Sequence, residues 1–154
     1  MCVLGKFDVP GAGRPKILVV EDEFLIALTL QSVLEDAGFE VLGPVLSVNA
    51  ALDLLENHRP DAAVLDINLR GEFVTPVAHK LKALGVPFAM SSAYAATAAT
   101  IDDVFAGAPM LNKPVCEQQL IKSITGIIGS GPSNAIRKAG RKKSAVHPQP
   151  GIGV

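Results

Sequence analysis

Short apolar segments alternate with segments of helical periodicity along most of the chain, and this alternation constrains the fold more than any other feature. Five short runs consist largely of apolar, often β-branched residues. Such runs are typical of strands that are buried on both faces, as in a parallel sheet. We expect strands at residues 17–20, 41–45, 62–66, 86–90 and 109–112.

Each expected strand is followed by a segment that favours a helix. Apolar residues recur every three or four positions at 26–37, 51–58, 74–84 and 120–128, and Ser47 is placed to cap the second of these helices. Residues 93–105 are rich in Ala and Thr and predict a weak or short helix. Five strand–helix pairs in strict alternation predict an α/β fold, with a parallel sheet covered by helices on both faces.

The length and the charge distribution predict one folded domain with two irregular ends. A chain of 154 residues is long enough for one well-packed domain. Residues 1–15 are rich in Gly and Pro and predict a flexible leader. Residues 130–154 hold five of the 14 basic residues and none of the 15 acidic ones, without an apolar period, so we expect a disordered basic tail. The domain itself, 16–129, is therefore acidic.

Several classes of protein are disfavoured by what the sequence lacks. Two cysteines, Cys2 and Cys116, are too few for a disulfide scaffold or a zinc site made of cysteines. No secretory signal and no apolar run of about 18–20 residues are present. We expect a soluble, cytoplasmic protein with no membrane partner.

Polar side chains follow the carboxyl ends of several expected strands. Open parallel sheets bind their ligands at this edge. Glu21 and Asp22 follow the first strand, Asp66 ends the third, Ser92 follows the fourth and Lys113 the fifth. If the first and third strands are neighbours, Asp22 and Asp66 face each other. Carboxylates this close repel one another unless a cation bridges them, and Mg²⁺ is the simplest such cation.

This set of residues has the chemistry needed to accept a phosphoryl group. Asp66 ends the central strand and is the best-placed nucleophile, because a carboxylate can form an acyl phosphate. Lys113 would neutralise charge on the phosphoryl oxygens, and the hydroxyl of Ser92 would donate to one of them. The expected metal ligands are Glu21, Asp22, Asp66 and the backbone carbonyl of Asn68.

Three segments, 17–23, 64–68 and 112–114, resemble the signatures of response-regulator receiver domains in sequence, order and spacing. The resemblance covers about residues 15–129. It implies a flavodoxin-like fold with strand order 2-1-3-4-5. It also implies Mg²⁺-dependent phosphorylation of Asp66 by a histidine kinase or a histidine phosphotransfer protein, a phosphoryl contact from Lys113, and a cis peptide bond between Lys113 and Pro114.

The sequence departs from the family pattern at several positions. Glu21 stands where Asp is frequent, and Ser92 stands where Thr is usual. Met110 replaces the aromatic residue that commonly switches, and Val115 replaces the usual Phe. Residues 87–94 resemble the so-called FAT GUY single-domain receivers, in which Tyr94 would take over part of the signalling role. The expected switch residues are Ser92, Tyr94 and Met110.

Only 25 residues follow Gly129, so we expect a receiver that stands alone and signals through protein contacts, as a phosphorelay or a phosphate sink. It would be a phosphoacceptor and not a turnover enzyme. The fourth and fifth helices, with the fifth strand, are the expected output surface.

Three alternatives stay open at this point. The first is a receiver-like binding module without phosphotransfer. The second is a phosphatase with an aspartyl nucleophile; such enzymes carry an acid two residues after the nucleophile, where this chain has Asn68. The third, a nucleic-acid regulator, depends only on the basic tail, which lacks aromatic residues and a helix-turn-helix pattern.

Overall fold

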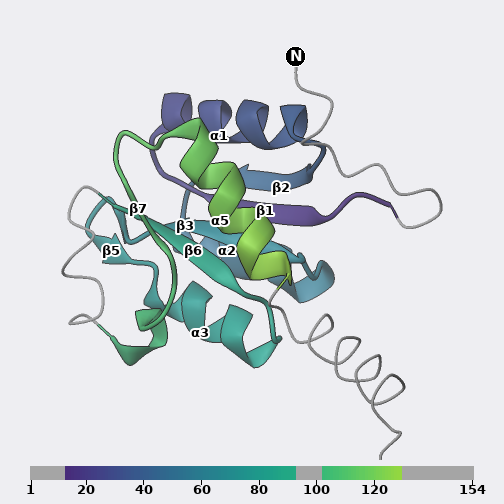
Figure 1. The fold of residues 1–154 in the computed structure, drawn as a ribbon. Coiled ribbons are helices and arrows are strands. Elements are labelled where there is room, and N and C mark those ends of the chain that lie inside the picture. The colour runs from purple at the N-terminus through teal and green to yellow at the C-terminus, as the bar shows by residue number, and fades with distance from the viewer. Residues whose placement is uncertain (1–12, 93–101, 130–154) are drawn as a thin grey trace, which may run out of the picture.

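Five parallel strands form the central sheet of this computed structural model, which describes residues 13–92 and 102–129 (Figure 1). Their order across the sheet is β2-β1-β3-β6-β7. Counted along the chain, this is the expected order 2-1-3-4-5, so the flavodoxin-like strand order is confirmed. The strands are β1 (Lys16–Val20), β2 (Glu40–Val45), β3 (Ala62–Asp66), β6 (Phe88–Ser92) and β7 (Met110–Asn112).

Helices cover both faces of the sheet, as expected. The helix α1 (Phe24–Asp36) and the helix α5 (Glu117–Gly129) lie on one face (Figure 1). The other face is covered by α2 (Val48–Asn57), α3 (Thr75–Ala83) and the short 3₁₀ helix η2 (Asp103–Phe105). Every residue of β3 is buried between these two layers, which explains why the sequence of this strand is almost wholly apolar.

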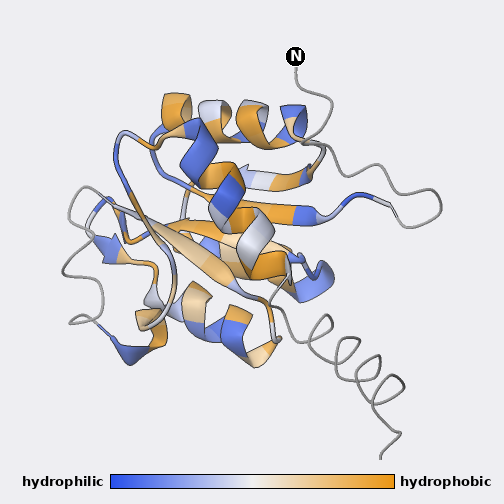
Figure 2. Cartoon of the chain, viewed as in Figure 1, coloured by the Kyte–Doolittle hydropathy of each residue, from blue (hydrophilic) through white to orange (hydrophobic). Residues whose placement is uncertain are grey.

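Two hydrophobic cores, one on each face of the sheet, hold the helices in place. Because successive side chains of a strand point to opposite faces, Leu18 and Leu65 pack toward α2 and α3 whereas Ile17 and Val64 pack toward α1 and α5. Figure 2 shows the apolar residues concentrated on the central strands and on the helix faces turned toward them. This packing fixes the carboxyl ends of the strands relative to one another.

Local signals in the sequence explain several element boundaries. Ser47 caps α2, and its Oγ accepts a hydrogen bond from the backbone N–H of Ala50 at 3.1 Å. The break expected in the second strand near Gly43 coincides with a cis Gly43–Pro44 peptide bond and an irregular register between Leu18 and Val20. A cis peptide bond also joins Lys113 to Pro114, as the family resemblance implies.

The structure corrects one expected strand and adds a hairpin. The fourth strand of the sheet was expected at residues 86–90, but β6 spans Phe88–Ser92. Its start is later because Pro87 has no backbone N–H for the ladder, and its end is later because Ser91 and Ser92 pair with β7. A small hairpin of β4 (Asn68–Leu69) and β5 (Glu72–Phe73) was not expected at all.

Parts of several expectations lie outside the described residues. They are the leader up to residue 12, the tail 130–154 and most of the expected helix at 93–105, of which the structure describes only the end, as η2. Within 13–92 and 102–129, no helix combines the length and the apolar character needed to cross a membrane.

Candidate functional site

A cleft of about 690 Å³ opens at the carboxyl edge of the sheet, where the sequence placed the reactive groups. Residues from four separate regions of the chain line this cleft, because the parallel strands all end at the same edge. The lining residues are Asp22, Glu23, Ile26, Asp66, Asn68, Arg70, Ser92, Lys113 and Pro114.

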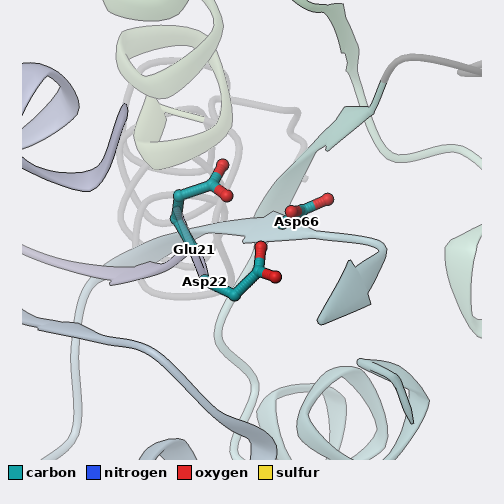
Figure 3. A group of neighbouring side chains, drawn as sticks. All are labelled: Glu21, Asp22 and Asp66. Atoms are coloured by element: carbon teal, nitrogen blue, oxygen red, sulfur yellow. The ribbon is translucent and has the colours of Figure 1, made fainter. Parts of the chain in front are cut away.

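Three carboxylates meet at this cleft (Figure 3). Residue Val20 of β1 is in register with Leu65 of β3, so the acidic residues that follow them emerge side by side. One oxygen atom from each of Glu21, Asp22 and Asp66 lies within 4.8 Å of the others. The expectation that Asp22 and Asp66 face each other therefore agrees with the geometry.

Lys113 supplies a positive charge to this acidic group. Its Nζ lies 3.0 Å from Oε2 of Glu21 and 3.0 Å from Oδ2 of Asp66. Its backbone N–H donates to the carbonyl of Ser92 at 3.2 Å, which ties the loop after β7 to the end of β6. Burial alone would lower the pKa of Lys113, but its hydrogen bonds to the two carboxylates and their charges outweigh burial and raise it.

Glu21 is the most buried member of the acidic group. It is fully buried, and its Oε1 accepts the backbone N–H of Glu23 at 3.1 Å. Burial raises the pKa of Glu21 to about 7, against the opposing effects of Lys113 and of the Glu23 hydrogen bond. Burial makes the negative charge on Glu21 unfavourable. A cation bound beside Glu21 would offset this cost.

Of the other residues expected at the site, two line the cleft and one does not. Ser92 and Asn68 both line the cleft, and the Asn68 side chain accepts the backbone N–H of Gly71 at 2.7 Å. The Asn68 side-chain oxygen is therefore already hydrogen-bonded, and the backbone carbonyl stays the group of Asn68 expected to bind the metal. Met110 is half-buried, packs against the core on the α2 and α3 face, and is not among the described residues that line the cleft. The switch role expected for Tyr94 lies outside the described residues.

Two further residues near the cleft were not singled out from the sequence. Arg70, in the unexpected hairpin, places its Nε 3.5 Å from Oδ2 of Asp22. Ser91 is buried, and its Oγ has no hydrogen-bond partner within the described part of the chain. Neither residue carries a local sequence signal, since Arg70 contacts a residue 48 positions away and Ser91 lies within a largely apolar strand.

The donor set of the cleft fits a hard divalent cation. It offers three carboxylates with oxygen atoms a few ångströms apart, which are ligands that Mg²⁺ accepts, and Asn68, the further expected ligand, lines the same cleft. Two basic residues, Lys113 and Arg70, pair with the three carboxyl groups, so negative charge is in excess once Glu21 is ionised. The cleft can therefore bind a cation and, beside it, an anionic group held by Lys113.

The pattern of the response regulator receiver domain matches residues 17–125, and the chain belongs to this family. Among curated proteins, the transcriptional regulatory protein PrrA of Mycobacterium tuberculosis is 32% identical over 121 residues, which cover 77% of this chain and 52% of PrrA. PdtaR of the same species is 32% identical over 62 residues, which cover 40% of this chain and 30% of PdtaR. The chain thus spans about half of PrrA and less of PdtaR.

Solved structures agree with this assignment. SdrG from Sphingomonas melonis Fr1 is 38% identical, with a TM-score of 0.62, and the match covers 73% of this chain and 94% of that one. A CheY-like receiver domain from Methanospirillum hungatei JF-1 is 26% identical, with a TM-score of 0.68 and coverage of 77% and 96%. The receiver domain of PhyR from Erythrobacter litoralis, at 21% identity and a TM-score of 0.69 over 78% and 94%, shows the shared fold.

Proposed function

We propose that this protein is a response-regulator receiver that accepts a phosphoryl group on Asp66 from a histidine kinase or a histidine phosphotransfer protein. The observation that carries the proposal is the position of the Asp66 carboxylate. It lies at the end of the central strand, 3.0 Å from Lys113 Nζ and beside two further carboxylates. An aspartate with a purely structural role at a strand end requires neither a lysine nor two further carboxylates beside it.

The contact between Lys113 and one oxygen of Asp66 supports a role of Asp66 as the nucleophile. Lys113 contacts Oδ2, and an oxygen of the carboxylate attacks the phosphorus of the donor. The new O–P bond forms as the bond from phosphorus to the donor nitrogen breaks, and the electron pair and a proton stay with the imidazole of the donor. Lys113 then contacts the oxygens of the acyl phosphate, and the hydroxyl of Ser92 donates to one of them.

Mg²⁺ is the cofactor we propose, held by Glu21, Asp22, Asp66 and the carbonyl of Asn68. When bound, it supplies positive charge that offsets the repulsion between the Asp66 carboxylate and the incoming phosphoryl group. The same residues would bind the cation more weakly below the pKa of Glu21, because a protonated carboxyl is a poorer ligand.

An exposed apolar surface beside the cleft supports a protein as the phosphodonor. Phe24 and Leu25 on α1 are 60% and 77% exposed, and Leu28 is 40% exposed. A cavity of about 220 Å³ links this helix to the loop that carries Lys113. Exposed apolar clusters of this kind mark protein-binding surfaces, so we propose that the donor docks on α1 next to Asp66.

The phosphorylation step is tested by incubating the protein with a small acyl phosphate or amidyl phosphate and Mg²⁺, and measuring the intact mass. We expect an acid-labile phosphoryl adduct, and no adduct when Mg²⁺ is chelated before the donor is added. A wild-type protein that gains no adduct under these conditions would contradict the proposal and favour the binding module without phosphotransfer.

The docking surface is tested with Leu25→Ser. This variant should slow phosphoryl transfer from the cognate kinase by about tenfold and leave labelling by the small donor unchanged. The matched control is Leu46→Ser, since Leu46 is also exposed, at 44%, but does not line the cleft or the adjoining cavity. Equal transfer rates for both variants would argue against docking on α1.

A further inference from the structure

Arg70 adopts a backbone conformation that its residue type disfavours. It has φ 56°, and among the described residues it is the one residue other than glycine with a positive φ. Together with Gly71, at φ 89°, it forms the two-residue turn between β4 and β5. Gly, Asn or Asp adopts this left-handed conformation more readily than other residues do. The turn by itself therefore does not explain an arginine.

The side chain of Arg70 does have a partner in the cleft. Its Nε lies 3.5 Å from Oδ2 of Asp22, and its Nη2 lies 3.5 Å from the Asp22 carbonyl oxygen. The Asp22 side chain is only 12% exposed, but that of Arg70 is 79% exposed. The guanidinium thus covers Asp22 from the solvent side, and it can leave without disturbing the core.

Two basic residues share the acidic group between them. Lys113 contacts Glu21 and Asp66, and Arg70 forms an ion pair with Asp22. Arg70 is therefore the counter-ion of a carboxylate that we assign to the cation site. A strained backbone at a functional site indicates that the side chain placed there has a role.

We propose that Arg70 is a positioning residue: its guanidinium pairs with the Asp22 carboxylate and competes with the divalent cation for it. Mg²⁺ binding in the cleft then requires the ion pair between Arg70 and Asp22 to break. Arg70 therefore lowers the affinity of the site for Mg²⁺. This inference rests on the proposed function, because it assumes that the cleft binds Mg²⁺.

The test is a calorimetric titration of the full chain with MgCl₂, at a pH above the pKa of Glu21. Arg70→Asn removes the charge and suits the left-handed turn, so it should bind Mg²⁺ about three- to tenfold more tightly than the wild type. Arg70→Lys keeps the charge and should stay within about twofold of the wild type. Lys82→Asn removes a positive charge near Gly85 and Val86, at the opposite edge of the sheet, and should change nothing.

The dependence on salt separates an electrostatic role from a structural one. Because Arg70 is exposed, high KCl should screen its charge and bring the affinities of wild type and Arg70→Asn to within about twofold. If the wild type binds Mg²⁺ and Arg70→Asn binds it no more tightly at low salt, the role of Arg70 is refuted and the proposed function stands. If the wild type binds no Mg²⁺, the magnesium site of the proposed function is refuted, and this inference with it.

Discussion

The central strand β3 has an aspartate at each end, and the two differ in almost every physical respect. Asp61 precedes the strand and is exposed, and its Oδ2 accepts the backbone N–H of Lys16 at 2.7 Å. Asp66 ends the strand, is buried and contacts Lys113 among other carboxylates. The same residue type thus ties two strands together at one end and forms a candidate reactive centre at the other, because the surroundings differ.

The contrast extends to the two edges of the sheet. At the amino edge a cavity of about 320 Å³ is lined mainly by apolar residues, among them Val86, Phe88 and Val104. At the carboxyl edge the larger cleft is lined by charges, and the buried Glu21 lies close to two of the lining residues, Asp22 and Asp66. Burial of apolar side chains stabilises a fold, whereas burial of crowded charges destabilises it. We infer that the first edge supports stability and the second supports chemistry.

The largest effect should follow from a change at the apolar edge. Phe88→Ala should lower the free energy of unfolding by about 3 kcal/mol, because it removes a buried aromatic ring and enlarges a cavity. Urea denaturation measures the loss. Affinity for Mg²⁺ should stay within about twofold of the wild type, and a larger change would contradict the separation of the two edges.

The pH dependence of stability should identify the charged edge. The pKa of Glu21 is about 7 in the folded protein and 4.5 in the unfolded chain, so the folded state binds the proton more tightly. This stabilisation is fully present below about pH 4.5 and is lost as the pH rises through about 7. The free energy of unfolding should fall by up to about 3 kcal/mol over this interval, measured by urea denaturation at several pH values.

Glu21→Gln is the control for this pH effect. The variant removes the titrating group, so its stability should change much less between the same pH values. Asp61→Asn should keep the pH dependence of the wild type, since Asp61 is exposed at the opposite edge. An unchanged slope in Glu21→Gln would show that another group is responsible.

Removal of the positive charge of the half-buried Lys113 should have a smaller but clear effect. Lys113→Met leaves Glu21 and Asp66 without their basic partner and should lower the free energy of unfolding by about 2 kcal/mol at neutral pH. Lys16→Met is the matched control, because Lys16 is exposed and should contribute less than about 0.5 kcal/mol. Thermal unfolding of both variants provides the comparison, and equal losses would contradict it.

The smallest expected effect concerns Ser91. Its buried Oγ has no partner within the described part of the chain, so Ser91→Ala should leave stability unchanged or raise it by about 0.5 to 1 kcal/mol. Denaturation by urea is again the measurement. A loss of more than about 1 kcal/mol would reveal a hydrogen bond that the structure does not contain.

The sheet and the acidic group could be predicted from the sequence because their signals are local. The run from Ile17 to Val20 indicates a buried strand by composition, and residues that follow parallel strands meet at one edge whatever the details of packing. Glu21, Asp22, Asp66 and Lys113 were therefore found by position alone. The family resemblance supplied the strand order and the expected phosphoacceptor.

Other features depend on contacts that no local pattern records. The hairpin of β4 and β5 has only two residues in each strand, too few to show a period. The contact between Arg70 and Asp22 joins positions far apart in the chain and exists only because that hairpin faces the end of β1. The raised pKa of Glu21 follows from its complete burial, which its position beside two other acids in the sequence does not suggest.

The most direct test of the central claim compares the two aspartates of β3 as phosphoacceptors. Wild type, Asp66→Asn and Asp61→Asn are treated with the same small phosphodonor and Mg²⁺, and the modified peptide is located by mass spectrometry. We predict one acyl phosphate on Asp66 in the wild type and in Asp61→Asn, and none in Asp66→Asn. An adduct that persists in Asp66→Asn would contradict the account.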